Sequence, residues 1–142
     1  MSVEVPSRVA VDSNVIAYLF SGDAAKANRA EAILLCEPKP VISTQVMNEV
    51  TLVLWRKMNL EWREINALMG DVEAFCEVVP VRLDIHKEAR RIAEQYGFRF
   101  YDACIVAFAL SEQCEVLFSE DMQHGQVIFG RLTVINPFLS PS

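Results

Sequence analysis

The sequence predicts a three-layer α/β/α sandwich with a short, mostly parallel central sheet. Short runs rich in β-branched residues alternate along the chain with stretches of helical periodicity, the pattern of strand–helix–strand units. The chain has 142 residues, of which 52% are hydrophobic, so we expect a single domain over residues 1–142 with a full-sized core. The sequence contains no linker, repeat or low-complexity tract.

Five short runs are predicted to be strands because Val and Ile are frequent in them. They occupy residues 8–12, 40–43, 77–81, 115–119 and 132–136.

Five longer segments between these runs are predicted to be helices, at residues 24–36, 44–58, 60–76, 84–96 and 102–113. Ser43 or Thr44 would cap the second helix, and Asn59 the third. In the fourth, apolar residues recur at the spacing of one helical face, and Gly97 would end it in a left-handed conformation. The fifth is apolar nearly all round, so it is expected to be central and buried.

Charge and hydropathy limit the functional class. A net charge of −6 argues against a broad phosphate-binding surface, though not against a nucleic-acid enzyme whose acids gather at one metal site. The longest apolar run, residues 103–110, is far shorter than the ~20 residues of a membrane-spanning helix, and no secretory signal is evident. We therefore expect a cytoplasmic protein without a membrane partner. Its four cysteines form no C-x-x-C pair and are expected to be reduced.

Four acidic residues stand near the ends of predicted strands. Asp12 follows the first strand directly, and Glu49 lies in the second turn of the helix after the second strand. Asp121 follows the strand at residues 115–119, and Asp102 opens the apolar helix that leads into that strand. Each acid alone has an ordinary structural interpretation, as a turn residue, a helix cap or a solvated helix residue. Because the carboxyl ends of parallel strands meet at one edge of a sheet, we expect all four to lie together.

Carboxylates crowded at the edge of a core repel one another, and desolvation there favours their protonation. A hard divalent cation removes both penalties, and Mg²⁺ accepts a few carboxylate oxygens while retaining waters or phosphate oxygens. The four acids therefore favour a metal site for phosphate chemistry.

The segments that hold these acids resemble the PIN-domain ribonucleases, most closely the VapC-type toxins of bacterial type II toxin–antitoxin pairs. They are VDSN at 11–14, the helix glutamate Glu49, Asp102 in FYDACIVAFAL, and SED at 119–121. The resemblance extends from Val9 to about Phe138. It implies a PIN-like fold, and it makes Asn14 and Ser119 polar residues that support the acids.

The resemblance implies an endoribonuclease that hydrolyses RNA phosphodiesters with a water activated by Mg²⁺ or Mn²⁺. Asp12, Glu49, Asp102 and Asp121 would be its catalytic acids. Asp12 and Asp102 are expected to bind metal directly, whereas Glu49 and Asp121 would hold a second ion or act through water. Asn14 would hold Asp12 by a hydrogen bond.

Partners follow from the same resemblance: an RNA substrate, a cognate antitoxin protein and a second copy of the chain in a homodimer. Arg99, three residues from Asp102, is the strongest candidate for a phosphate contact, although a solvated surface arginine is the ordinary alternative. An apolar-rich stretch around Asn59 is expected to be core in part, and the antitoxin or the second copy would cover the rest. Its apolar residues are Trp55, Leu60, Trp62, Ile65 and Met69.

Three other functions remain open at this point. A metal-independent ribonuclease would use the only two histidines, His86 and His124, as general base and acid. A phosphatase or phosphotransfer domain would use Asp12 as a nucleophile, but it expects an aspartate where this chain has Asn14, and a lysine beside an acidic motif. A non-catalytic scaffold would keep the fold and only bind a partner, which the presence of all four acids argues against.

Overall fold

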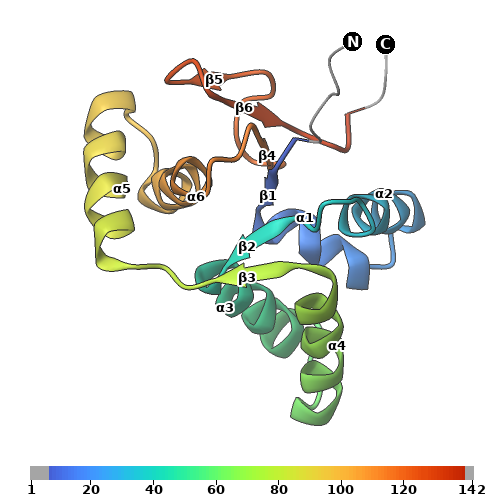
Figure 1. Ribbon diagram of the computed structural model, residues 1–142. Coiled ribbons are helices and arrows are strands. Elements are labelled where there is room, and N and C mark those ends of the chain that lie inside the picture. The colour runs from blue at the N-terminus through green and yellow to red at the C-terminus, as the bar shows by residue number, and fades with distance from the viewer. Residues whose placement is uncertain (1–6, 140–142) are drawn as a thin grey trace.

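The computed structural model describes residues 7–139, which form a mixed α/β fold around a six-stranded sheet (Figure 1). The strand order is β3-β2-β1-β4-β6-β5, and every neighbouring pair is parallel except β5 and β6. The strands are β1 Val9–Val11, β2 Val41–Ser43, β3 Glu77–Val79, β4 Val116–Phe118, β5 Val127–Ile128 and β6 Leu132–Ile135. The predicted mostly parallel sheet is therefore confirmed, with β5 as an additional short strand.

Helices lie on both sides of the sheet. In Figure 1, α5 and α6 lie on one side of β1, with α1 and α2 on the other, and α3 and α4 extend below β2 and β3. The α-helices are α1 Ser13–Ala17, α2 Ala24–Leu34, α3 Thr44–Leu52, α4 Trp62–Phe75, α5 Leu83–Tyr96 and α6 Phe100–Ser111. A 3₁₀ turn, η1 Tyr18–Phe20, follows α1, and a π-helical turn, η2 Val53–Lys57, follows α3.

Local sequence signals explain where several helices begin and end. The Ser43 hydroxyl accepts a hydrogen bond from the Val46 backbone N–H at 3.1 Å, so Ser43 is the N-cap of α3. Gly97 ends α5 with a φ of 71°, the left-handed conformation that costs glycine least. Both features are as predicted.

Several predicted boundaries are wrong, among them the start of α6, which begins at Phe100 and so has Asp102 in its first turn. The N-cap of α4 is Glu61, which forms a capping box with Glu64, while Asn59 has a φ of 53° and belongs to the preceding turn. The predicted helix at residues 44–58 is α-helical only to Leu52 and then widens into the π-helical turn η2. The short helix α1 was not predicted, because five residues are too few to show a periodicity.

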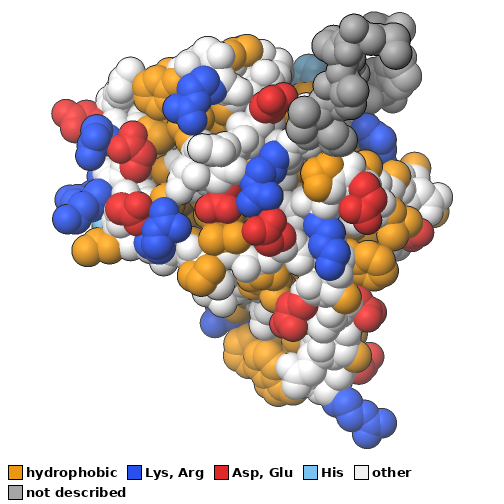
Figure 2. Space-filling view, in the orientation of Figure 1, with side chains coloured by type: hydrophobic (Ala, Val, Ile, Leu, Met, Phe, Trp, Pro, Cys, Tyr) orange, Lys and Arg blue, Asp and Glu red, His pale blue; other side chains and the backbone are white. Residues whose placement is uncertain are grey.

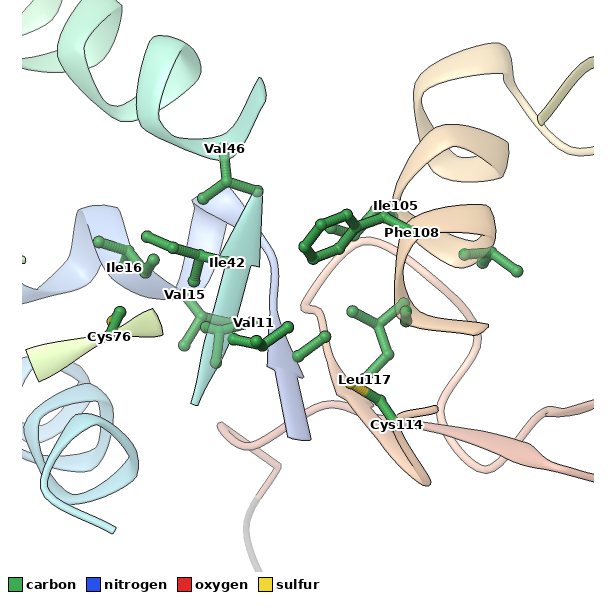
Figure 3. Packing of buried hydrophobic residues seen from close by; sticks show 14 of the residues in the cluster. Val11, Val15, Ile16, Ile42, Val46, Cys76, Ile105, Phe108, Cys114 and Leu117 are labelled. Carbon is green, nitrogen blue, oxygen red and sulfur yellow. The ribbon is translucent and has the colours of Figure 1, made fainter. Parts of the chain in front are cut away.

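The hydrophobic core fills the space on both sides of the central strands. Phe108 and Ile105 of α6 point from their helix toward Val11 of β1 and Leu117 of β4 (Figure 3). Ile16 of α1 lies on the other side of β1, so the sheet is covered on both faces. The helix α6 is buried over most of its length, as its composition predicts.

All four cysteines are free thiols, in agreement with the prediction of reduced cysteines. Burial raises the pKa of the Cys76 thiol to about 11 and that of Cys114 to about 12, so both stay protonated and pack as small apolar groups. Between residues 7 and 139, the structure contains no helix long and apolar enough to cross a membrane.

The face shown in Figure 2 carries no broad basic surface, because Lys and Arg side chains there are interspersed with Asp and Glu. Hydrophobic side chains gather on the lower projection, which α4 forms in Figure 1. Trp55 of η2 and Trp62 at the start of α4 are stacked with ring centroids 5.6 Å apart, and both are exposed.

Phe108 provides a test of this core, because its side chain is only 1% exposed. We expect Phe108→Ala to lower the free energy of unfolding by about 3–5 kcal/mol, through lost burial and the cavity left behind. Urea denaturation of the purified variant measures this loss. A loss below about 1 kcal/mol would contradict the packing of α6 against the sheet.

Candidate active site

Asp12 directly follows β1 at its carboxyl end, and its backbone is still hydrogen-bonded to β4. Its backbone N–H donates to the Phe118 carbonyl at 2.9 Å. The side chain caps α1: Oδ1 accepts a hydrogen bond from the Ser13 backbone N–H at 2.8 Å. Oδ2 accepts one from the Ser119 hydroxyl at 2.9 Å. Asp12 is 9% exposed and Ser119 is fully buried, so this carboxylate is held in a fixed position at the edge of the core.

The loop after β4 is held by Asn14. The Asn14 side-chain N–H donates to Asp121 Oδ2 at 3.1 Å, and its carbonyl oxygen accepts from the Glu120 backbone N–H at 3.2 Å. The expected hydrogen bond from Asn14 to Asp12 is therefore wrong, because Asn14 is turned toward the β4 loop, and Ser119 contacts Asp12 instead. Asn14 still lies next to the acids, but it orients Asp121.

The other two acids lie on helices that approach the same edge. Glu49 is half-buried on α3 and Asp102 is half-buried in the first turn of α6. Burial raises the pKa of Glu49, and the charges of Asp12 and Asp102 raise it further. Burial also raises the pKa of Asp102; the charge of Arg99 opposes this shift, and that of Asp121 adds to it. The structure thus brings Glu49 within electrostatic reach of Asp12 and Asp102, and Asp102 within reach of Asp12 and Asp121.

The pKa of Asp12, the most buried of the four acids, also depends on the charges of its neighbours. Burial raises the pKa of Asp12, and the hydrogen bonds from Ser119 and Ser13 oppose that shift. The charges of Asp102 and Asp121 raise the pKa of Asp12 further. Four carboxylates from four separate segments therefore share one patch at the carboxyl edge of the sheet.

The donor set fits a hard divalent cation, because it consists of carboxylates whose mutual repulsion a cation would relieve. Between residues 7 and 139, no three His, Cys, Asp or Glu side chains stand close enough to hold an ion as they are placed here. Like-charged carboxylates are expected to stand apart until a cation draws them together. The four acids are a candidate site because their charges raise the pKa values of Asp12, Glu49 and Asp102, although their oxygens form no closed set of ligands.

Sequence reasoning missed a cluster around Glu120, which is next to Asp121. Lys26 Nζ lies 2.8 Å from Glu120 Oε2, and the Tyr18 hydroxyl donates to Glu120 Oε1 at 2.8 Å. Lys26 also donates to the Tyr18 hydroxyl at 3.1 Å and lies 4.4 Å from the centre of the Tyr18 ring. The fold therefore places a lysine beside the SED segment, although none is its neighbour in the sequence. Lys26 is on α2, far from Glu120 in the sequence, so no local pattern reveals the contact.

The two histidines have separate environments. His124 is exposed, and its Nδ1 accepts a hydrogen bond from the Asn136 backbone N–H at 3.0 Å. His86, on α5, packs edge-to-face against Phe100 with ring centroids 5.6 Å apart. Neither contact pairs one histidine with the other as a general acid and base would require.

The fold and the sequence match known proteins. A family model described as PIN domain matches residues 9–129. A toxin–antitoxin complex from Klebsiella pneumoniae contains a chain 26% identical to this one, with a TM-score of 0.67 and coverage of 93% of this chain and 98% of that chain. No match was found among curated proteins.

Two further solved structures share the fold. The toxin VapC20 of Mycobacterium tuberculosis, which cleaves the sarcin–ricin loop, has 20% identity and a TM-score of 0.66, over 80% of this chain and 91% of that chain. FitAcB from Neisseria gonorrhoeae has 20% identity and a TM-score of 0.63, over 92% of this chain and 98% of that chain.

The matched residues 9–129 run from β1 to the end of β5 and include all four acids. The order of the acids along the sequence, the parallel sheet and the family match agree with one another. The chain therefore belongs to the PIN-domain family, with the fold of VapC-type toxins.

Proposed function

We propose that this protein is a divalent-metal-dependent endoribonuclease, and that Asp12, Glu49, Asp102 and Asp121 form its catalytic site. The observation that carries this proposal is the electrostatic coupling of these acids at one edge of the sheet. Membership of the PIN-domain family supports a nuclease over a phosphatase with Asp12 as nucleophile. The whole chain would act as one domain in the cytoplasm.

Asp12 and Asp102 would hold Mg²⁺ or Mn²⁺ directly, with Glu49 and Asp121 acting on a second ion or through water. The bound ion would supply a water of lowered pKa and offset the charge that develops at the phosphate. The hydroxyl of Ser119 keeps Asp12 in one orientation while leaving further lone pairs on its oxygens free.

The remaining residues orient the acids and the substrate. Asn14 holds Asp121 in position by the hydrogen bond to Oδ2. Glu49, with its raised pKa, would orient the attacking water and accept its proton. Arg99, exposed at the start of α6 next to Asp102, would contact a phosphate of the RNA.

We also propose that the protein is the toxin of a toxin–antitoxin pair and forms a homodimer. The toxin–antitoxin complex from Klebsiella pneumoniae supports an antitoxin partner. Exposed apolar surface supports partners of this kind: Trp55 and Trp62 are stacked in solvent, and a groove of about 260 Å³ lies between α2 and α4. Leu35 and Phe75 of that groove are exposed.

The first test is removal of one metal ligand. We expect Asp102→Asn to lower the rate of RNA cleavage by more than about 100-fold and to weaken Mn²⁺ binding measured by isothermal titration calorimetry. EDTA should abolish cleavage by the wild type.

Asp84→Asn is a matched control, because Asp84 is an exposed aspartate at the start of α5 that pairs with Arg82. It should bind Mn²⁺ and cleave RNA like the wild type. Cleavage that persists in EDTA, or an Asp102→Asn variant with full Mn²⁺ affinity, would refute the proposed site.

A second test uses the raised pKa of Glu49. A carboxyl whose pKa rises on folding binds protons more tightly in the native state, so stability falls as the pH rises through that range. In EDTA at pH 7, Glu49→Gln should therefore have a higher melting temperature than the wild type. The difference should vanish below the ordinary glutamate pKa of about 4.3. A wild type more stable than Glu49→Gln at pH 7 would count against crowding of the acids.

A third test concerns Lys26, which we expect to position Asp121 through Glu120 and Asn14. Lys26→Met should lower Mn²⁺ affinity and cleavage by about 10-fold, the lower end of the effect of residues that orient ligands. Lys26→Arg should restore most of both, because it keeps the cation. Lys87→Met, at an exposed lysine of α5, is the control. If Lys26→Met and Lys87→Met bind Mn²⁺ and cleave RNA equally well, Lys26 does not position Asp121.

A further inference from the structure

A cleft of about 150 Å³ opens beside the acids, between α3, α5 and α6. Gln45 and Glu49 of α3 line one side. His86 of α5 and the neighbouring aromatic residues Phe100 and Tyr101 of α6 line the other. Since Glu49 belongs to both the cleft and the acidic patch, the two are continuous.

The aromatic side chains of this cleft are not part of the hydrophobic core. Phe100 is 40% exposed and Tyr101 is 65% exposed, whereas most of α6 is buried. The ring of Phe100 is supported by His86 at a centroid distance of 5.6 Å, and Tyr101 lies beside it at 6.0 Å. Glu49 lines the same cleft, so a ligand against these rings lies next to that acid.

The dimensions and chemistry of the cleft suit a planar ring. A cavity of about 150 Å³ holds one benzene molecule, so this cleft has room for one aromatic ring system at its open side. Bases stack on exposed aromatic side chains in proteins that bind single-stranded nucleic acid. The carboxamide of Gln45 has both donors and acceptors, which suit the edge of a base.

The net charge of the protein favours a contact of this kind for an RNA substrate. A net charge of −6 leaves little electrostatic attraction for phosphates, which usually supply much of the affinity. Stacking of one base on aromatic side chains strengthens binding by about 5- to 150-fold and needs no positive surface.

We propose that this cleft binds one unpaired nucleobase of the RNA, next to the cleaved phosphodiester. The base stacks on Tyr101 and Phe100, and Gln45 contacts its edge. This inference rests on the proposed nuclease function, because it places the base by reference to the acids. It adds the recognition of a single-stranded nucleotide to that function.

The test compares an oligoribonucleotide that the wild type cleaves with copies of it in which one nucleotide near the cleaved bond is abasic. One of these abasic sites should lower the wild-type kcat/KM by about 5- to 150-fold, the equivalent of one stacked base. Tyr101→Leu should lower kcat/KM on the intact RNA by a similar factor, mainly by raising KM. Replacing the intact RNA by that abasic copy should lower the kcat/KM of Tyr101→Leu little further. Tyr101→Phe should retain most of the activity because it retains the ring.

Several controls separate this inference from the nuclease function. Phe129→Leu removes an exposed aromatic side chain from the turn between β5 and β6 and should leave kcat/KM unchanged. Mn²⁺ affinity and melting temperature should be the same in Tyr101→Leu and the wild type, because Tyr101 is mostly exposed. A wild type that cleaves no RNA would refute the nuclease function itself.

Two results would overturn the cleft proposal while leaving the nuclease function intact. In the first, Tyr101→Leu cleaves the intact RNA as well as the wild type, or is as sensitive as the wild type to every abasic site. In the second, Tyr101→Leu changes the oligomeric state in analytical ultracentrifugation, which would assign the aromatic rings to an interface between two copies of the chain.

Discussion

The candidate site depends on one nearly buried carboxylate, that of Asp12, which is held in place at the ends of two adjacent parallel strands. Asp12 continues β1, Ser119 continues β4, and the hydrogen bond of 2.9 Å between their side chains joins the strand ends. An ionised carboxyl in that position is costly because it has lost most of its water. The cost is reduced by the Ser119 hydroxyl and the Ser13 backbone N–H, and it is increased by the neighbouring acids. Such a group is suited to binding a cation because it gains the most from a positive charge.

The surroundings of this carboxylate differ on its two sides. On the side of α1 and α2, a network of hydrogen bonds runs from Lys26 through Glu120 and Asn14 to Asp121, and it fixes the loop after β4. On the side of α5 and α6, the acids border an aromatic cleft. One side therefore has the contacts that position an acid, and the other has surface on which a substrate can lie.

Much of this could be predicted from the sequence, because the signals are local. Val-rich runs predicted the strands, Ser43 and Gly97 predicted helix ends, and acids at the strand ends predicted a patch of carboxylates. Features set by tertiary contacts were missed or wrong. Asn14 contacts Asp121 rather than Asp12, and Lys26 pairs with Glu120 across the fold. The cleft beside Glu49 also depends on how three helices meet, which no single segment encodes.

The most direct measurement of the central claim is a crystal structure of the protein grown with Mn²⁺, with anomalous scattering data used to locate the ion. We expect an anomalous peak in contact with the carboxylates of Asp12 and Asp102, with Glu49 and Asp121 turned toward it. An ion bound elsewhere, or no peak near these four residues at a Mn²⁺ concentration that supports RNA cleavage, would contradict the account.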